Sequence, residues 1–512
     1  MSFTSILFVE STERERDYNL SMNAPECFVD LNLDRVVSAI TQGRDEYDIN
    51  AFFFSPLKNV EDISYRQEVI QDVAKKEVYA TLIAYSTHMR TIREILSKKE
   101  NMFYHFQKRR WELDCIILYT NAISELCARL NEFPVESRGM LNFKSYINEY
   151  NHGEIFQKLH ANACLVKNRL EEIKYSTKIN GNTIIVERYC QEIDYSDKII
   201  NLFSKFKQRD VRVELDFKSN DSGINHVEAQ ILDCVAKLFH SEFDVLNTFI
   251  ANHPDYVDST LTKFEREIQF YLAYIEYIQK FQKELPFCIP TVTREKKGIS
   301  VSKAFDLALA DAVIESNRKV ICNEFYLQDN ERILVVSGPN QGGKTTFARM
   351  VGQLHYLALL GVFVPAEEAK LYLTDRIFTH FEKSENIHNL RGKLYDDLVR
   401  IKVILDSATS RSLIIMNEIF TSTSTQDAVY LGTRIMEKIL ALDALCVCVT
   451  FIDELTHLNC SIVSMMSTVG SNDCALRTYQ VIRKPADGVA YSTTLVEKYS
   501  LTYDKIKERL GR

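Results

Sequence analysis

Residues 337–346 read Ser-Gly-Pro-Asn-Gln-Gly-Gly-Lys-Thr-Thr. Within them, Gly338 to Thr345 follow the pattern G-x-x-x-x-G-K-[ST] of a phosphate-binding loop. The apolar run 333–336 predicts a buried strand before the loop, and a helix is expected after it. Glycines let backbone N–H groups point at phosphate oxygens, and the helix adds its positive N-terminal end. The stretch therefore predicts a nucleotide site. The simpler alternative is a tight strand-to-helix turn with a solvated Lys344.

Two side chains of this loop have expected roles. Lys344 should reach the β- and γ-phosphates, and the Thr345 hydroxyl should ligate Mg²⁺. The predicted nucleotide-binding residues form one run, namely Gly338, Pro339, Asn340, Gln341, Gly342, Gly343, Lys344, Thr345 and Thr346.

The composition is that of a globular protein, with 46% apolar and 26% charged residues among 512. A net charge of −8 means that any nucleic-acid contact must come from local basic patches. No apolar run approaches the roughly 18 residues of a membrane span, and the N-terminus lacks the basic region of a signal peptide. The 12 cysteines form no C-x-x-C pair, which disfavours a zinc site and favours reduced core thiols. A cytoplasmic location is expected.

The chain is expected to divide near residue 290, with an α + α/β fold overall. Before that point, apolar residues at three- and four-residue spacing predict helices over 66–98, 100–132, 155–174 and 224–285, the last with one weak break at 251–254. A small β-containing or irregular insertion is predicted over 176–218. From 291 to 512, strands are predicted over 332–337, 371–379, 412–417, 444–450 and 461–468, alternating with helices over 344–360, 390–408 and 424–441.

A second motif lies 73 residues after Lys344, where the apolar strand 413–416 runs into Asn417 and Glu418. In many P-loop ATPases this strand ends in Asp-Glu, in which the Asp supports Mg²⁺ and the Glu activates the attacking water. Glu418 is therefore the predicted catalytic residue, and Asn417 joins Thr345 as a predicted metal-site residue. The alternative for Glu418 is a carboxylate that only caps the next turn.

A run of hydroxyl residues follows directly. Either Ser424 or Thr425 is expected to cap the next helix. The same loop could present hydroxyl groups to a neighbouring nucleotide, as a trans-acting site made of Ser422, Thr423, Ser424 and Thr425.

Two basic clusters, at 107–111 and 205–212, each include an aromatic residue, a combination that can grip phosphates and stack a base. The alternative is an ordinary solvated surface, with Trp111 packed inward in the first cluster. The candidate DNA contacts are Lys108, Arg109, Arg110, Lys205, Lys207 and Arg209.

Together these motifs resemble the ATPase domain of the MutS family of DNA mismatch-repair proteins. The resemblance covers about residues 300–512 and continues through Gly361–Ala366, Asp375–Thr379 and Thr423–Thr425. It implies an ABC-type, Mg²⁺-dependent ATPase domain that binds ATP and works as a homodimer with composite sites. A weaker similarity at 53–66 matches the segment that opens the family's helical lever. The resemblance thus implies that residues 1–290 form a helical core and lever region, in which the insertion at 176–218 corresponds to the family's DNA-gripping clamp.

Several positions depart from the family pattern. The resemblance begins at the family's core domain, so the mismatch-binding and connector domains are expected to be absent. Asn417 replaces an acid, and Phe451 replaces a histidine that would contact the γ-phosphate. The family's Ser-Thr-Phe motif is missing, and its nearest equivalent is residues 391–394. These changes lead us to expect slow hydrolysis.

Three functions are compatible with these residues. The first is an ATP-dependent DNA-binding dimer related to mismatch repair or DNA-structure processing. The second is a nucleotide-dependent switch that acts on a protein partner without DNA. The third, a metabolic kinase, would need an acceptor pocket and a substrate lid that the helical half does not suggest.

Overall fold

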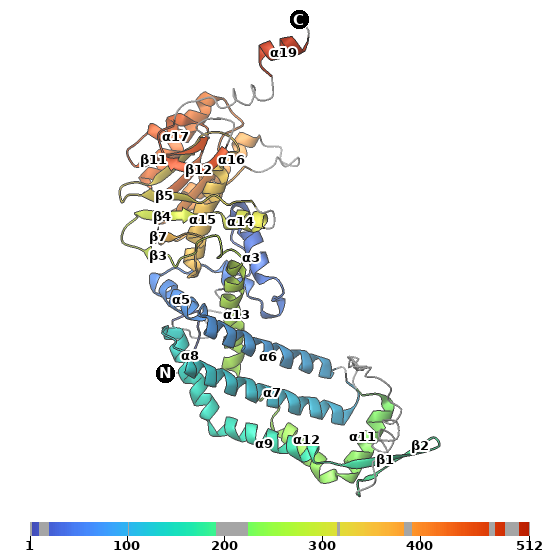
Figure 1. Ribbon diagram of the computed structural model, residues 1–512. Coiled ribbons are helices and arrows are strands. Elements are labelled where there is room, and N and C mark those ends of the chain that lie inside the picture. The colour runs from blue at the N-terminus through green and yellow to red at the C-terminus, as the bar shows by residue number, and fades with distance from the viewer. Residues whose placement is uncertain are drawn as a thin grey trace. The chain divides into compact units, whose positions relative to one another are not determined.

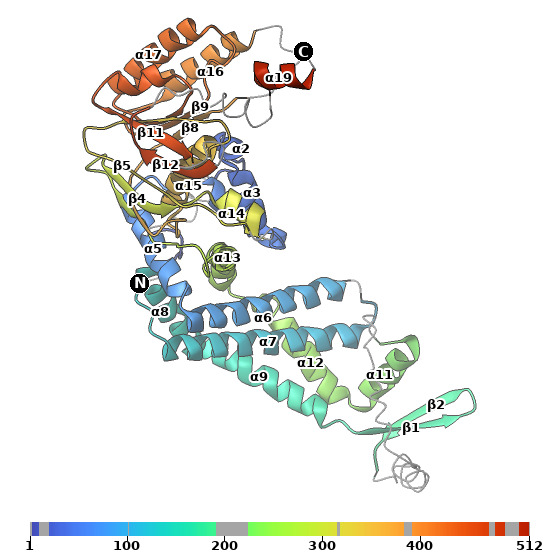
Figure 2. The same cartoon turned by 45° about the horizontal axis from the view of Figure 1, so that its top comes forward.

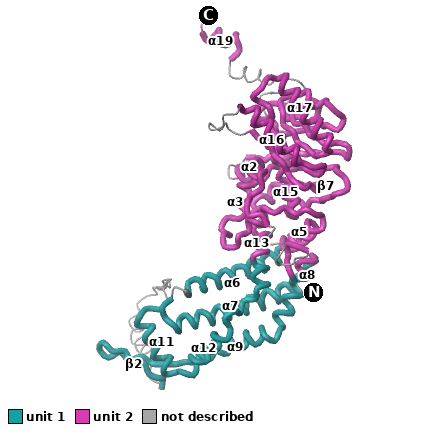
Figure 3. The backbone as a smooth tube through the Cα atoms, turned by 180° about the vertical axis from the view of Figure 1, so that it is seen from behind, with its two compact units in different colours: residues 1–3, 76–135, 142–265 teal, residues 4–75, 136–141, 266–512 magenta. Residues whose placement is uncertain are grey.

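The structure, a computed structural model, describes residues 3–9, 20–100, 102–190, 224–314, 318–382, 392–469, 477–486 and 501–510. The chain forms two compact units, which Figure 3 colours separately. Unit 1 comprises residues 1–3, 76–135 and 142–265, and unit 2 comprises residues 4–75, 136–141 and 266–512. Each unit therefore takes its residues from three separate stretches of the chain.

Unit 1 is built mainly from long helices (Figure 1). Their apolar faces meet in a shared core, in which Leu113, Leu159 and Phe249 come from three different helices and are buried. The helices of this part of the chain are α6 (Lys76–Glu100), α7 (His105–Glu132), α8 (Arg138–His152), α9 (Glu154–Glu171), α11 (His226–Leu238), α12 (His240–Asn252) and α13 (Ser259–Gln279), of which α8 and α13 also extend into unit 2.

Two of the predicted long helices are interrupted. The segment 224–285 holds three helices, because Phe239 leaves the helical conformation and Asp258 accepts the Leu261 amide to start α13. The segment 66–98 is shared by two helices, since α5 (Val60–Val73) ends before α6 begins. The single-helix prediction for 66–98 is therefore wrong. In 224–285 the weak break predicted at 251–254 is confirmed, since α12 ends at Asn252, but the break at Phe239 was not predicted. Apolar periodicity continued across the two unpredicted breaks and hid them.

The predicted insertion begins with a β-hairpin. Strands β1 (Tyr175–Asn180) and β2 (Thr183–Arg188) pair antiparallel, and Gly181 turns between them with a φ of 59°. This confirms β structure in the first part of the segment 176–218. Residues 191–218 lie outside the described part of the chain.

Unit 2 contains a six-stranded sheet in the order β12-β11-β6-β10-β9-β8. All neighbouring strands are parallel except the edge strand β12, which runs antiparallel to β11. The strands are β6 (Ile333–Ser337), β8 (Ile377–His380), β9 (Leu413–Asn417), β10 (Leu445–Val449), β11 (Ile462–Val469) and β12 (Arg477–Arg483).

Helices cover both faces of this sheet. Helices α16 (Lys393–Ser407) and α17 (Thr425–Ala441) lie on one face (Figure 2), where Cys446 and Cys448 share their core. Helix α15 (Lys344–Leu360) packs on β9 and β10 from the other side. Successive side chains of each strand point to opposite faces of the sheet. Because both faces are covered by helices, the strands are continuous apolar runs in the sequence. The cysteines described by the structure are all free thiols.

A second, four-stranded sheet has the order β3-β7-β4-β5, and short helix α14 (Leu307–Val313) follows its strand β4. Its strands are β3 (Thr291–Thr293), β4 (Ile299–Ala304), β5 (Asn323–Leu327) and β7 (Glu368–Tyr372). The strand predicted over 371–379 is wrong as one element, because β7 and β8 belong to different sheets. Asp375 stands at the break, where it accepts the hydroxyls of Thr409 and Ser412.

The N-terminal helices of unit 2 pack against α15. They are α2 (Cys27–Leu31), α3 (Leu33–Thr41), α4 (Asn50–Phe54) and α5. Side chains of α15 donate to their backbone carbonyls: Arg349 to Asp30 at 3.0 Å, and Gln353 to Leu31 at 2.9 Å. Residues 20–75 thus hold α15 on its side away from the sheet. Among the described residues, no helix has the length and apolarity to cross a membrane.

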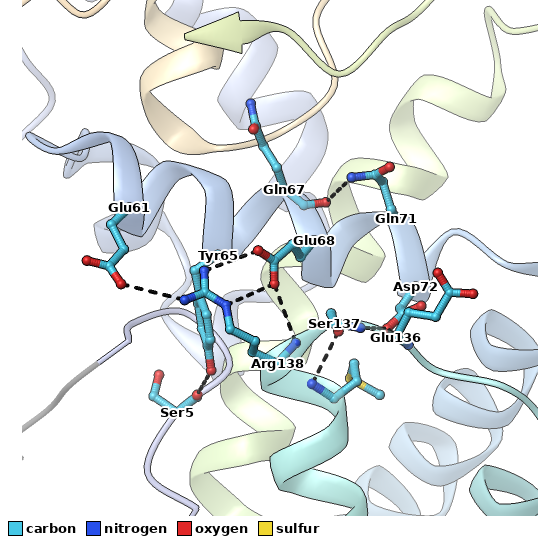
Figure 4. Close-up of polar contacts among 11 residues, drawn as sticks. Ser5, Glu61, Tyr65, Gln67, Glu68, Gln71, Asp72, Glu136, Ser137 and Arg138 are labelled. Atoms are coloured by element: carbon cyan, nitrogen blue, oxygen red, sulfur yellow. Dashed lines mark hydrogen bonds and ion pairs between the residues drawn. The ribbon is translucent and has the colours of Figure 1, made fainter. Parts of the chain in front are cut away.

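A short stretch after α7, residues 136–141, includes the first turn of α8 and docks on α5 (Figure 4). Asp72 accepts the backbone amides of Glu136 at 2.8 Å and Ser137 at 2.7 Å. Arg138 forks onto Glu68 with two contacts of 3.1 Å. The residues that Figure 4 labels all belong to unit 2. Charge-assisted hydrogen bonds to Asp72 and Glu68 therefore hold the stretch to α5.

Asp72→Asn is expected to loosen this stretch. Burial alone would raise the pKa of Asp72, but the hydrogen bonds from Lys75, Ser137 and Glu136 outweigh it and the pKa lies below its ordinary value. The carboxylate therefore stabilises the fold above its unfolded pKa near 3.8, and this is lost as the pH falls through the lower folded value. At pH 7 we expect a loss of about 2 kcal/mol, or roughly thirtyfold faster amide exchange at 136 and 137.

Hydrogen exchange followed by mass spectrometry measures this effect. Glu61→Gln is the control, because Glu61 is an exposed carboxylate of the same helix and stands 3.6 Å from Arg138. Exchange in this control should stay near that of wild type. Equal exchange in Asp72→Asn and wild type at pH 7 would contradict the assigned role of Asp72.

Candidate functional site

The candidate site forms where parallel strands end side by side. In register, Val449 of β10 pairs with Val336 of β6 on one side and with Asn417 of β9 on the other. The carboxyl ends of three neighbouring strands therefore meet at one edge of the sheet. In open α/β sheets this edge is where ligands bind.

The loop between β6 and α15 needs its glycines. Gly338 and Gly343 have φ values of 109° and 91°, which side chains disfavour. At Gly342 an added Cβ would lie 2.1 Å from the Ser467 Oγ and 2.9 Å from the Pro339 carbonyl oxygen. Asn340 and Gln341 form the exposed tip of the loop. The tight curl is thus a property of this sequence, and it turns the chain directly into α15.

Lys344 is the first residue of α15 and its side chain folds back over the loop. Its Nζ donates to the Gly338 carbonyl at 2.8 Å, to the Pro339 carbonyl at 3.2 Å and to the Asn340 Oδ1 at 3.2 Å. The side chain is buried, and this desolvation lowers the pKa of Lys344 against the opposing charge of Glu418. The solvated lysine of the simpler alternative is therefore not what this structure contains.

The structure brings the two predicted metal-site residues together. The Thr345 hydroxyl donates to the Asn417 Oδ1 at 2.9 Å, joining the start of α15 to the end of β9. Thr346 follows on the first turn of the helix and is half-buried. An amide oxygen next to a hydroxyl is a neutral donor set that suits a magnesium ion keeping several of its waters.

Glu418 directly follows β9 and adopts an unusual backbone conformation. Its φ is 53°, in the left-handed region, and its amide donates to the Val449 carbonyl at 2.9 Å. Phe420 is also left-handed, with a φ of 62°. Such conformations cost about 1 kcal/mol or more in residues with side chains. The tertiary structure thus holds Glu418 beside Lys344 in a conformation that its sequence does not favour.

Two residues of this site were missed by motif reasoning. The buried Ser467 of β11 donates from its Oγ to the Gly342 carbonyl at 2.8 Å. Arg477, the first residue of β12, donates to the Asn340 carbonyl at 3.2 Å. Neither belongs to a recognisable motif. Only the strand order, which places β11 beside β6, could have pointed to Ser467.

The hydroxyl run after Glu418 has a structural role in the described fold. Ser424 caps α17, since its Oγ accepts the Asp427 amide at 3.2 Å and donates to the Asp427 carboxylate at 2.7 Å. Thr423 approaches the same carboxylate at 3.4 Å. Ser422, Ser424 and Thr425 are exposed, so the surface they form is open to a ligand or a second copy of the chain.

The two residues that follow β10, Thr450 and Phe451, differ in character from the Asn417 and Glu418 at the end of β9. Thr450 is buried, and its Oγ1 accepts the Ile452 amide at 3.0 Å. Phe451 is half-exposed and brings no hydrogen-bonding group. This part of the edge therefore offers no free polar side chain from residues 450 and 451.

The first basic cluster is partly neutralised. Arg109 pairs with Glu112 at 3.1 Å and Arg110 with Asp114 at 3.1 Å, both on the same helix. Lys108 and Trp111 are half-buried. The cluster thus keeps features of both interpretations, a phosphate-gripping face and a solvated helix. Lys205, Lys207 and Arg209 lie outside the described residues.

Comparison with known proteins identifies the region around this site. Residues 334–497 match the family model described as MutS domain V. The match includes the loop, Asn417, Glu418 and Ser467.

Residues 334–497 of this chain are a MutS-family domain V.

Individual relatives agree with this assignment. Over 149 residues the chain is 36% identical to the DNA mismatch repair protein MutS of Zymomonas mobilis, covering 29% of this chain and 17% of the relative. It is 31% identical over 160 residues to human DNA mismatch repair protein Msh3, covering 31% and 14%. MutS of Thermotoga maritima is 27% identical over 241 residues, covering 41% and 30%. The matched part of this chain therefore spans less than a third of each relative.

Proposed function

We propose that this MutS-family chain is an ATP- and DNA-binding ATPase whose nucleotide state controls closure of a homodimer and its hold on DNA. Residues 291–512 would form the ABC-type ATPase domain, and the helices before them the core and lever. The pathway would be mismatch repair or the processing of DNA structures. The support in the relatives is that their names place them in DNA mismatch repair.

The observation that carries this proposal is the meeting of Lys344, Thr345 and Asn417 at one sheet edge. The Thr345–Asn417 contact of 2.9 Å joins the helix after the loop to the neighbouring parallel strand. That arrangement fits a nucleotide with Mg²⁺, because loop amides, an ammonium and a neutral oxygen pair lie within one site. Lys344 would bind phosphate oxygens, and Thr345 with Asn417 would hold the ion. When bound, Mg²⁺ supplies positive charge that offsets the charge of the phosphates.

Glu418 is the proposed base. Its place after β9 lets its carboxylate orient a water and accept its proton. Its neighbour Asn417 carries no charge, so the metal would be held more weakly than by a carboxylate. Slow turnover is therefore part of the proposal.

The fold offers a route by which the loop could influence the rest of unit 2. Helix α15 starts at Lys344 and ends against α5, where the Arg66 guanidinium donates to the Leu360 carbonyl at 3.3 Å. Arg66 also donates to the Leu7 carbonyl at 3.0 Å. If nucleotide binding shifted α15, α5 would have to move with it, because closely packed helices transmit a displacement instead of deforming continuously.

A DNA-binding titration tests the proposal. Labelled duplex, mismatched, junction and single-stranded probes would be titrated by anisotropy with and without ATP and Mg²⁺. We expect ATP to change the affinity for at least one probe by about fivefold or more, and affinity to fall steeply with salt. Absence of DNA binding at low salt, with and without ATP, would contradict it.

A second function, a nucleotide-dependent switch on a protein partner without DNA, has its own support. Arg109 and Arg110 are already paired within their helix, and the net charge is −8. Such a switch needs only a two-state element that the nucleotide biases. A partner whose capture changes with nucleotide, together with no DNA binding in the titration above, would favour this function.

A further inference from the structure

A pocket of about 530 Å³ lies in unit 2 beside the end of α13. It is lined by the turns after that helix, by the end of α14 and by the approach to β5. None of the loop residues 338–346 lines it, so it is separate from the candidate nucleotide site. Its volume is within the range of pockets that take a small ligand or several side chains.

The rim of this pocket is cationic. Lys280, Lys283, Arg318 and Lys319 line it, against a single acid, Glu284. In the described part of the chain none of these four cations forms an ion pair, and Lys280 rests over the Tyr277 ring at 5.1 Å. On a chain with a net charge of −8, such a group of cations without acidic partners indicates an anionic ligand.

The floor of the pocket is mainly aliphatic. Phe281 is its one ring and is buried, with 2% of its surface exposed. Leu285, Val320 and Ile314 supply aliphatic surface, and Ile314 is 41% exposed. Single-stranded nucleic acid binds by stacking its bases on exposed aromatic rings, and this floor has no exposed aromatic ring.

We propose that this pocket binds an acidic peptide segment of a partner protein, with an apolar side chain inserted in the floor and carboxylates on the rim. The cations come from two separate stretches, 280–283 and 318–319, which matches carboxylates spaced along a chain. The apolar side chain supplies burial, while the rim charges supply orientation and association rate. The inference does not depend on nucleotide binding.

Fluorescence anisotropy on the full chain tests this. The probe is a labelled twelve-residue peptide in which aspartate and glutamate flank two leucines and a phenylalanine. The same peptide with serine in place of each acid, and a twelve-nucleotide single strand, are compared with it. We expect the acidic peptide to bind at least about tenfold more tightly than the serine peptide at low salt, and to weaken as salt rises.

The double variant Lys283→Glu/Arg318→Glu should weaken the acidic peptide about tenfold or more. Ile314→Ser should weaken it too, by about threefold or more, without changing the salt dependence. Lys402→Glu is the control, since Lys402 is an exposed cation on α16 outside the pocket, and should bind like wild type.

Three results would overturn the proposal. The first is that the acidic and serine peptides bind with equal affinity, and the second is that the double variant binds the acidic peptide as tightly as wild type does. The third is that the oligonucleotide binds more tightly than the acidic peptide and that the double variant no longer binds it. The last result would assign the pocket to nucleic acid. ATP binding, measured in the same samples, should be unchanged by the pocket substitutions, so a failure here is distinct from a failure of the nucleotide site.

Discussion

Replacing Glu418 by glutamine is expected to slow ATP turnover at least about a hundredfold while ATP affinity stays within about threefold of wild type. The two side chains have nearly the same size, so the left-handed turn at residue 418, with its φ of 53°, should survive. What is lost is the carboxylate that would accept a proton from the attacking water. Phosphate release at saturating ATP measures turnover, and calorimetry measures affinity.

Glu437→Gln is the matched control, because Glu437 is an exposed carboxylate of α17 paired with Arg434 at 3.0 Å. It should turn over ATP at the wild-type rate. Equal turnover in wild type and Glu418→Gln would refute the role of base and leave Glu418 as a carboxylate of the turn alone.

Lys344→Ala is expected to weaken ATP binding by about a hundredfold or more, or about 3 kcal/mol. The ammonium folds back over the loop, and phosphate oxygens would replace the carbonyls of Gly338 and Pro339 as its partners. Its pKa is lowered mainly by burial, so the charged form opposes folding at neutral pH, an effect that disappears above the ordinary value of 10.5. Loss of binding therefore need not come with loss of stability.

Titration with a fluorescent ATP analogue measures this affinity. Because Lys344 also holds the loop carbonyls, Lys344→Met serves as a second variant that keeps most of the buried volume. Both variants should melt near the wild-type temperature and both should lose binding. Lys402→Ala, on the exposed face of α16, should bind like wild type. ATP affinity within threefold of wild type in Lys344→Met would contradict the proposed contact.

The strands and helices around the site were predictable because local signals agreed with one another. Helix α15 has the predicted bounds 344–360, and β6, β9, β10 and β11 each lie within a residue or so of their predictions. Each strand is buried on both faces and bounded by turn residues, so the apolar run and the strand coincide. Ser424 as the cap of α17 was likewise one of two local alternatives.

The helical half was less predictable. Phe239 interrupts a pattern whose apolar spacing continues on both sides, whereas the end of α12 at Asn252 falls at the weak break predicted for 251–254. Helix α8 was not predicted, although Met140, Phe143 and Ile147 recur at three- and four-residue spacing and are buried. Periodicity reports which face is apolar, and two packed helices in sequence can share a period without sharing an axis.

From the sequence alone one obtains the loop, its helix and the strand that ends in Asn417 and Glu418, because glycine conformations and apolar runs are encoded over a few neighbouring residues. The joining of Thr345 to Asn417, the clasp of Ser467 on Gly342 and the strained turn at Glu418 come from strand order, which depends on pairing between residues far apart in the chain. The same is true of α15, whose outer side is covered by residues 20–75. Long-range packing has no short sequence signature. The sequence therefore predicted which residues take part in the site, and the tertiary structure was needed to show how they are arranged.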